Sequence, residues 1–167
     1  MRAQSLASVA IGSLSLVTVA HAQTEPPVAN DVFVELIGSA PIVSVNYERQ
    51  VAPHLGLRLG VGYLSGTGFT GNDFYRVQIP VVLSTTLGSG AKRLELGAGV
   101  VPGILTTSGS GHRVETPATV VMGYRYCPPE GGFIFRASFT PLIDTWDSTW
   151  SGLRFIPLVG VSFGYAF

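Results

Sequence analysis

The sequence places a histidine, serines and a carboxylate close together in one short stretch, SGSGHRVET. His112 lies there with Ser108, Ser110 and Glu115 within a few residues, and a serine, a histidine and an acid are the parts of a hydrolase. The stretch is rich in Gly and Ser, which hold no side chain in place, and catalysis depends on positioning. We therefore favour a solvated loop over a catalytic trio and expect neither a catalytic residue nor a cofactor.

Three glutamates, Glu35, Glu48 and Glu95, are a second candidate, because paired acids can act as general acid and base. Arginines outnumber them at equivalent positions of the surrounding segments. A charge-neutralising network is therefore the interpretation we favour. The glycine-rich stretches GTGFTGND and TTSGSGH have no Gly-Lys-Ser/Thr after them, so they predict no phosphate loop.

The remaining reactive residues are isolated from one another. His54 lies in a tight turn, where we expect a solvated residue and not a ligand. Cys127 is the only cysteine, which excludes an intrachain disulfide and leaves a free or mixed-disulfide thiol. Asp73, Asp144 and Asp147 are expected to be solvated loop acids, with contact to divalent cations on lipopolysaccharide as the alternative. No metal site is predicted.

The first 22 residues have the features of a cleaved secretory signal peptide. Arg2 precedes an apolar run, and the small residues Ala20 and Ala22 come just before the expected new N-terminus, Gln23. A retained membrane anchor is the alternative, but the run is shorter than the roughly 20 residues of a spanning helix. We expect a signal peptide over 1–22, a flexible segment over 23–30 and a single domain over 31–167.

Composition favours strands in a membrane over a water-soluble fold. Charged residues make up 12% of the chain and hydrophobic ones 46%, with a mean hydropathy of +0.39; soluble domains carry roughly 25% charged residues. The 21 glycines and 11 prolines disfavour long helices. The formal net charge of zero gives no basic surface for nucleic acid.

Eight segments alternate between apolar and polar residues with the period of two that is typical of strands. They cover about 31–38, 42–51, 55–64, 74–86, 92–105, 117–126, 133–142 and 153–167. The connections APH, LGSGA and CPPEGG are tight turns, whereas those around 65–73, 107–116 and 143–152 are longer and polar, although GSAP after the first strand is short. Short turns at one end and long loops at the other indicate an all-β, eight-stranded antiparallel up-and-down transmembrane barrel.

Nine charged residues within the eight segments fall on one face, whereas Arg49, near a strand end, lies on the apolar face. This polar face carries the predicted network of lumen charges, Glu35, Glu48, Arg58, Arg76, Arg93, Glu95, Arg125, Arg136 and Arg154. A soluble lipocalin-like carrier would turn this face to water, whereas a membrane barrel would turn it inward. An arginine facing lipid at mid-depth costs about 2–4 kcal/mol, so a barrel in a bilayer must hold these arginines inside.

Register and the chain ending give two further expectations. If the turn after the second strand centres near Pro53, Glu48 and Arg58 lie opposite each other on the inward face and pair. In GVSFGYAF, Phe163, Tyr165 and Phe167 share the opposite, lipid-facing side.

Prolines also fall within the predicted strands, at 80, 102, 141 and 157. They predict bulges or broken ladder bonds that open the wall to lipid, or strands that end earlier.

The segments NDVFVELIGSAPIVSVNYERQV, HLGLRLGVGYL, LELGAGV, GYRYCPPEGGFIFRASFTPL and GVSFGYAF resemble a group of small outer-membrane barrels of Bacteroidota-type bacteria. In architecture alone the chain is similar to the OmpA/OmpX-type fold. The ending also resembles the signal that the barrel-insertion machinery reads, with Phe163, Tyr165 and Phe167 in the signal positions. The resemblance implies location in the cell outer membrane and contact with its lipid and lipopolysaccharide, but no particular activity.

We therefore expect a structural or surface-interaction protein of the cell envelope, with an extracellular ligand left open. The three long loops would form the contact surface, and Trp146 and Trp150 would anchor it at the lipid interface or to a partner. A lipid-modifying enzyme acting at the extracellular rim, which would hydrolyse or transfer acyl groups of lipid A or phospholipid, is the alternative. A solute pore is disfavoured by the strand count.

Overall fold

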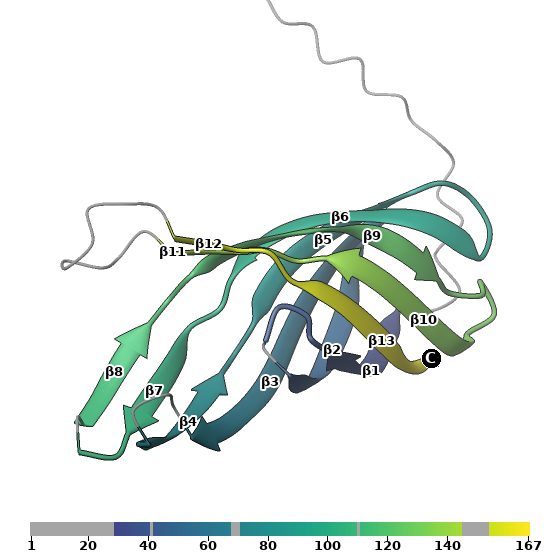
Figure 1. The fold of residues 1–167 in the computed structure, drawn as a ribbon. Coiled ribbons are helices and arrows are strands. Elements are labelled where there is room, and N and C mark those ends of the chain that lie inside the picture. The colour runs from purple at the N-terminus through teal and green to yellow at the C-terminus, as the bar shows by residue number, and fades with distance from the viewer. Residues whose placement is uncertain (1–28, 41, 68–70, 110, 145–153) are drawn as a thin grey trace, which may run out of the picture.

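The computed structural model describes residues 29–40, 42–67, 71–109, 111–144 and 154–167 (Figure 1). The predicted signal peptide, with Ala20, Ala22 and Gln23, lies outside these ranges, as do most of 23–30 and Ser110, Trp146, Asp147 and Trp150. Within the described ranges, no helix is long and apolar enough to cross a membrane.

Thirteen strands in the described part of the chain form one antiparallel sheet. They are β1 Asn30–Leu36, β2 Val43–Ala52, β3 Leu55–Thr67, β4 Asp73–Gln78, β5 Val81–Leu87, β6 Lys92–Val100, β7 Gly103–Thr107, β8 Gly111–Glu115, β9 Ala118–Tyr126, β10 Gly132–Phe139, β11 Leu142–Asp144, β12 Arg154–Ile156 and β13 Val159–Ala166.

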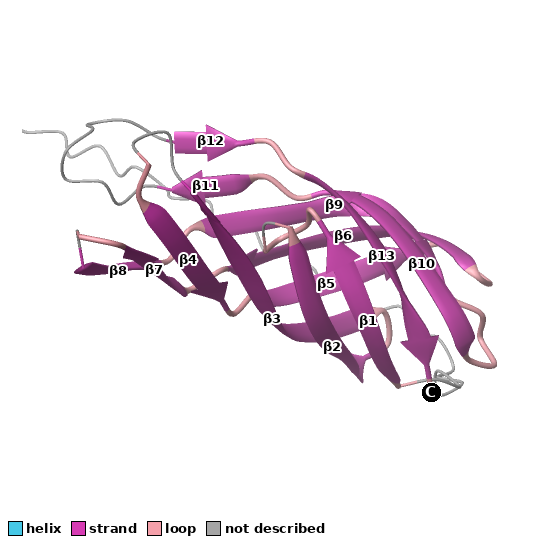
Figure 2. Cartoon of the chain, turned by 60° about the horizontal axis from the view of Figure 1, so that its bottom comes forward, coloured by secondary structure: helices cyan, strands magenta, loops and turns pink. Residues whose placement is uncertain are grey.

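The sheet closes on itself because β1 pairs with both β2 and β13 (Figure 2). β4 and β5 both pair with β3 and continue one another, and the pairs β6–β7, β8–β9, β10–β11 and β12–β13 are likewise two parts of one barrel strand. Thirteen strands thus make eight barrel strands, each antiparallel to its neighbours. The predicted closed, eight-stranded antiparallel barrel is confirmed.

Each of the five interruptions coincides with a proline, at positions 80, 102, 117, 141 and 157. Proline has no N–H to donate to the ladder, but its carbonyl still accepts. Ile79 N–H donates to Pro102 O and Val101 N–H to Pro117 O, each at 2.8 Å, and Gly60 N–H donates to Pro80 O at 3.0 Å. Neighbouring strands stay joined at these three prolines, so a local interruption describes them better than a lateral opening.

The two ends of the barrel differ. The end with the C-terminus has the tight connections at Pro53–His54, Gly88–Ala91 and 127–131. We call this part, built from β1, β2, the start of β3, β5, β6, β9, β10 and β13, the closed half. The open half consists of the end of β3 with β4, β7, β8, β11 and β12, and in Figure 1 it lies at the far end from the C-terminus.

Two expected loops contain strand residues. The stretch expected to be a loop over 107–116 contains β8, a hairpin partner of β7, and β3 and β4 extend into the expected loop over 65–73. The prediction was wrong here because the Gly and Ser residues of 107–111 indicated a loop, and Arg113, Val114 and Glu115 were included in that loop. These three residues alternate as a strand does.

One connection folds into the barrel. The turn between β1 and β2 buries Gly38, Ser39 and Ala40, and Ile37 N–H donates to Ile42 O at 3.0 Å. A Cβ added to Gly62 would lie 2.4 Å from that of Ala40, so only glycine leaves room for the turn at that place on β3. The inward path explains why this connection is short.

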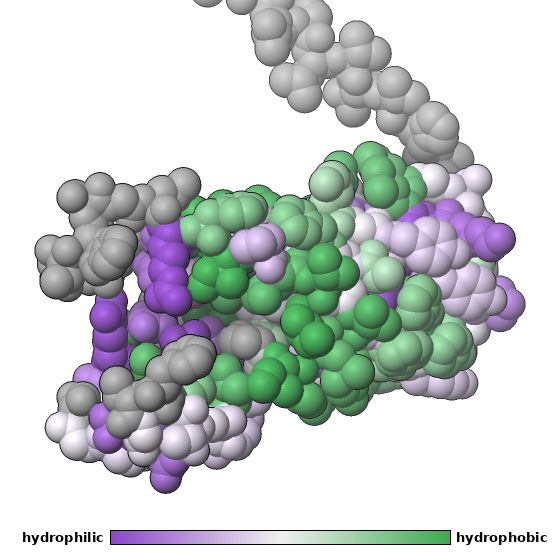
Figure 3. Space-filling model, viewed as in Figure 1, coloured by the Kyte–Doolittle hydropathy of each residue, from purple (hydrophilic) through white to green (hydrophobic). Residues whose placement is uncertain are grey.

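The outer face of the barrel is apolar. Val34, Val45, Leu59 and Val61 are each exposed by more than 40% on the outside, whereas their sequence neighbours Glu35, Asn46 and Gly60 face the interior and are buried. On the face that Figure 3 shows, hydrophobic residues, in green, cover the middle of the barrel. The faces are therefore arranged in the opposite sense to those of a water-soluble barrel.

Candidate functional site

The interior of the closed half holds a cluster of ionic side chains. Its members are Asp31, Glu35, Glu48, Arg58, Glu95, Arg125 and Arg136, which come from β1, β2, β3, β6, β9 and β10. Each is at most 3% exposed. Four carboxylates and three guanidinium groups therefore share one buried space, where unpaired charges would be costly.

Glu48 lies at the centre of this cluster. Its Oε2 accepts from Arg58 Nε at 3.3 Å and from Arg136 Nη1 at 2.8 Å, and its Oε1 accepts from Arg125 Nη1 at 2.5 Å. Charge-assisted bonds of this kind are among the stronger hydrogen bonds in proteins. Glu48 thus joins three arginines from three different barrel strands.

Two further carboxylates complete the links. Glu95 Oε1 accepts from Arg58 Nη2 at 2.5 Å and lies 3.4 Å from Arg136 Nη1. Asp31 Oδ2 accepts from Arg136 Nη2 at 2.8 Å and also from Arg125 Nη2. The connected side chains come from β1, β2, β3, β6, β9 and β10, so the cluster links these strands across the interior of the closed half.

Glu35 is attached to the cluster more loosely than the other acids. Its Oε1 lies 3.7 Å from Arg58 Nη1 and has no hydrogen-bond partner among the described residues. Its Oε2 accepts from the backbone N–H of Ser39 at 3.1 Å. Glu35 therefore connects the ionic cluster to the inward-folded turn above it.

An aromatic ring lies against the cluster. Phe33 is 1% exposed and faces inward between Asp31 and Glu35 on β1. The guanidinium carbon of Arg136 lies 4.2 Å from the ring centroid and that of Arg58 lies 5.0 Å away, both within the range of cation–π contact. On its other side Phe33 belongs to an apolar group with Cys127, Ile134 and Ala166.

The cluster brings together six of the nine predicted lumen charges and leaves three elsewhere. Arg93 lies near a tight turn, where its Nε donates to Gly90 O at 2.8 Å. Arg76 lies in the open half and pairs with Glu115 at 3.0 Å. Arg154 is exposed on β12, with Asp144 opposite it on β11. Strand alternation assigns a face to each residue but no depth along the barrel, so these three could not be separated from the sequence.

Sequence reasoning missed Asp31 and Phe33. Asp31 has the same parity as Glu35, and that spacing could have placed it on the inward face. Phe33 has the same parity but an apolar side chain, so a search for charges passed over it. The Glu48–Arg58 pairing expected from the turn position is present, since these two residues are direct partners in the β2–β3 register.

The proposed hydrolytic trio is not assembled by its described members. His112 and Glu115 lie three positions apart on β8 and so face opposite sides of the sheet. His112 Nδ1 is 2.8 Å from Thr106 Oγ1, while Glu115 faces inward with Arg76. Ser108 is exposed in the β7–β8 turn.

The isolated residues lie outside the cluster or at its edge. His54 is exposed in the β2–β3 turn, and Cys127 is a buried free thiol at the start of the β9–β10 turn. Asp73 accepts from Thr67 Oγ1 at 2.8 Å. The described residues contain no group of three or more His, Cys, Asp or Glu side chains that could hold a metal ion.

The fold and the buried cluster together define a class: a closed eight-stranded barrel with an apolar outside and an ionic inside, as in outer-membrane barrels. No family model and no curated protein sequence matches the chain. Among solved structures, it is similar to the N-terminal β-barrel domain of Pseudomonas aeruginosa OprF. The TM-score is 0.61 at 18% identity, covering 84% of this chain and 96% of that one.

A second similar structure is Ail, the attachment invasion locus protein of Yersinia pestis, in complex with the heparin analogue sucrose octasulfate. The TM-score is 0.50 at 13% identity, again covering 84% of this chain and 96% of that one. At these identities the likeness concerns the fold, which agrees with the eight-stranded architecture expected from the sequence.

Proposed function

We propose that this chain is an integral protein of a bacterial outer membrane, with a structural or surface-interaction role in the cell envelope. The observation that carries the proposal is the opposed chemistry of the two barrel faces. Three arginines and four acids are at most 3% exposed inside, while valine, leucine and aromatic side chains are exposed outside. A lipid bilayer suits this arrangement, because hydrocarbon contacts the apolar outer face while the ionic face stays inside the barrel.

The tight turns and the C-terminus indicate the orientation. The three tight turns lie at the end that carries the C-terminus, as periplasmic turns do in such barrels. Phe163, Tyr165 and Phe167 are 45%, 61% and 58% exposed there. We assign this end to the periplasm and these three side chains to the aromatic girdle and the signal read by the barrel-insertion machinery. The open half then faces the cell exterior and its lipopolysaccharide.

The interior favours a closed element over a pore. The ionic cluster links six strands across the closed half, and the inward turn with Ser39 and Ala40, both 0% exposed, lies next to it. Side chains fill the interior of an eight-stranded barrel in this way. The open half is therefore the part available for contact with a partner, and Ail shows that a similar fold has been solved with a bound anionic sugar.

A fractionation and folding experiment tests the proposal. The full chain expressed in a Gram-negative host should appear in the outer-membrane fraction, and purified protein should fold only with detergent or lipid, seen as a heat-modifiable band on a gel. Planar-bilayer recordings should show no steady conductance. Folding of the purified polypeptide in plain buffer would refute the membrane proposal and favour the soluble carrier.

No second function is proposed. A lipid-modifying enzyme would need the groups around His112 to converge, and the described members of that set face opposite sides of β8. Turnover of labelled lipid A or phospholipid by the folded protein, lost in His112→Ala, would overturn this choice.

A further inference from the structure

The inner wall of the open half carries a row of alternating leucines and arginines. Leu64, Arg76, Leu105 and Arg113 are successive partners across β3, β4, β7 and β8. Directly opposed residues of antiparallel strands share a face, and Arg76 lies two positions from the buried, inward Gln78. The whole row therefore faces the interior.

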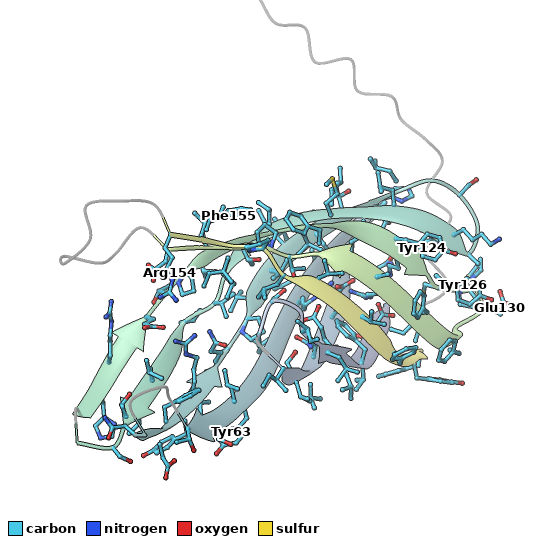
Figure 4. All side chains as sticks on the ribbon, viewed as in Figure 1. Tyr63, Tyr124, Tyr126, Glu130, Arg154 and Phe155 are labelled. Atoms are coloured by element: carbon cyan, nitrogen blue, oxygen red, sulfur yellow. The ribbon has the colours of Figure 1, made fainter. Side chains whose placement is uncertain are left out.

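The opposite wall continues the same pattern. Leu142 is 3% exposed and is the partner of both Thr119 and Ile156, which places Ile156 on the inward face. Arg154 lies two positions from Ile156 and so faces the same side. Figure 4 shows Arg154 and Phe155 on opposite sides of β12.

Solvent reaches this inner surface, unlike that of the closed half. The side chains of Arg76 and Arg113 are 21% and 50% exposed, and Leu64, Leu105 and Ile156 are partly exposed. Ala40, Val101 and Leu142 are apolar residues that are at most 3% exposed. A purely structural barrel gains nothing from solvent-exposed leucine and isoleucine in its interior, because these side chains lose the favourable free energy of burial.

The charges of this surface favour an anion. Its inward residues are Arg76, Arg113 and Arg154 against Glu115 and Asp144, a surplus of one positive charge among the described residues. Glu115 contacts two of the arginines, Arg76 at 3.0 Å and Arg113 at 3.6 Å. The Nε of Arg76 is buried and has no hydrogen-bond partner among the described residues. In Figure 3 hydrophilic side chains gather between β8 and the β11–β12 hairpin.

We propose that the open half is a binding site for a single-chain anionic amphiphile. The acyl chain lies over Leu64, Leu105 and Ile156, and the carboxylate or phosphate head lies at the arginines. Eight-stranded barrels can hold one small ligand, and ligand sites combine an apolar lining with a few polar groups. This goes beyond a structural role, since it assigns a ligand class to the interior.

Photolabelling tests the site. The folded full chain in zwitterionic phosphatidylcholine nanodiscs is irradiated with a diazirine analogue of dodecanoic acid, and the labelled residues are mapped by mass spectrometry. We expect labels on inward residues such as Leu64, Leu105 and Ile156, and competition by dodecanoate or dodecyl phosphate but not by dodecanol. Stronger competition by dodecyl phosphate identifies a phosphate-bearing membrane lipid as the source, and stronger competition by dodecanoate identifies a free fatty acid.

Matched variants separate the site from the lipid-facing surface. Leu105→Trp fills the inner surface and should reduce inward labelling about tenfold, whereas Ile104→Trp, on the outward face of the same strand, should not. Arg76→Gln with Arg113→Gln should weaken labelling about tenfold, and the outward-facing Arg49→Gln should leave it unchanged. Labels confined to outward Val77, Ile104 and Val114, or equal competition by dodecanol, would overturn the proposal. The heat-modifiable band shows separately whether each variant folds, so a failed membrane proposal is recognised independently.

Discussion

Glu48 on β2 and Arg58 on β3 are direct partners across the sheet, and both side chains point into the barrel with Nε and Oε2 3.3 Å apart. The same carboxylate also binds Arg125 and Arg136. A local hairpin pair is thus the starting point of a cluster whose other members come from distant parts of the chain.

Removing the charge of Glu48 should destabilise the barrel strongly. In Glu48→Gln three arginines lose the negative charge that they share, and one of the two acceptor oxygens becomes an NH2 group that cannot accept. Breaking such buried pairs costs about 3–5 kcal/mol. Urea unfolding in lipid vesicles, followed by tryptophan fluorescence, measures the change. Glu130→Gln, in an exposed turn, is the control and should stay within about 0.5 kcal/mol of the parent.

The pair energy itself follows from a double-mutant cycle. Glu48→Gln combined with Arg58→Met should cost less than the two single changes together, because the second change removes one charge that the first leaves unpaired. The coupling should be about 1 kcal/mol or more. Strict additivity would mean that the contact contributes nothing to stability.

Gly164 is predicted to be irreplaceable. A Cβ there would lie 2.1 Å from Val32 O and 2.4 Å from the Cβ of Phe33, so β1 and β13 would have to separate. We expect Gly164→Ala to lose about 1–3 kcal/mol or more and to show a reduced heat-modifiable band. Val161→Ala on the same strand serves as the control, and normal folding of Gly164→Ala would contradict the close approach of these strands.

The face of each strand residue and the register of the β2–β3 hairpin can be predicted from the sequence. Alternation assigns a face to nearly every strand residue, and the turn at Pro53 fixes the register that pairs Glu48 with Arg58. The closed barrel follows from eight such segments. Each of these inferences needs only neighbouring residues, which is why the sequence suffices for them.

Other features depend on distances along the barrel axis. Arg76 and Arg136 have the same inward parity, yet one lies in the open half and the other in the buried cluster. The inward path of Gly38–Ala40 depends on space left by Gly62 on another strand. None of these can be derived from local pattern.

His54 has a backbone conformation that side chains rarely adopt. Its φ is 63°, and it follows Pro53 in the tight turn between β2 and β3; glycine meets no steric cost there and β-branched residues meet the largest. His54→Val should lose about 1–2 kcal/mol, whereas His54→Gly should match or exceed the parent. Denaturant midpoints in vesicles give the comparison, and equal loss in both variants would assign a role to the imidazole.

Cys127 should be slow to react in the folded barrel. The residue is 4% exposed, next to Phe33, Ile134 and Ala166, and burial raises the pKa of its thiol, with the charge of Asp31 adding to the effect. Because the thiolate is the reactive form, maleimide labelling at pH 7–8 should be at least about tenfold slower in the folded protein than in urea. The same raised pKa means that the folded state holds the proton more tightly, so stability should fall as the pH rises above the roughly 8.5 of an unfolded thiol. A Cys127→Ser, Glu130→Cys variant moves the thiol to an exposed position of the same turn and should label rapidly when folded. Rapid labelling of the parent would instead mean that this end of the barrel opens.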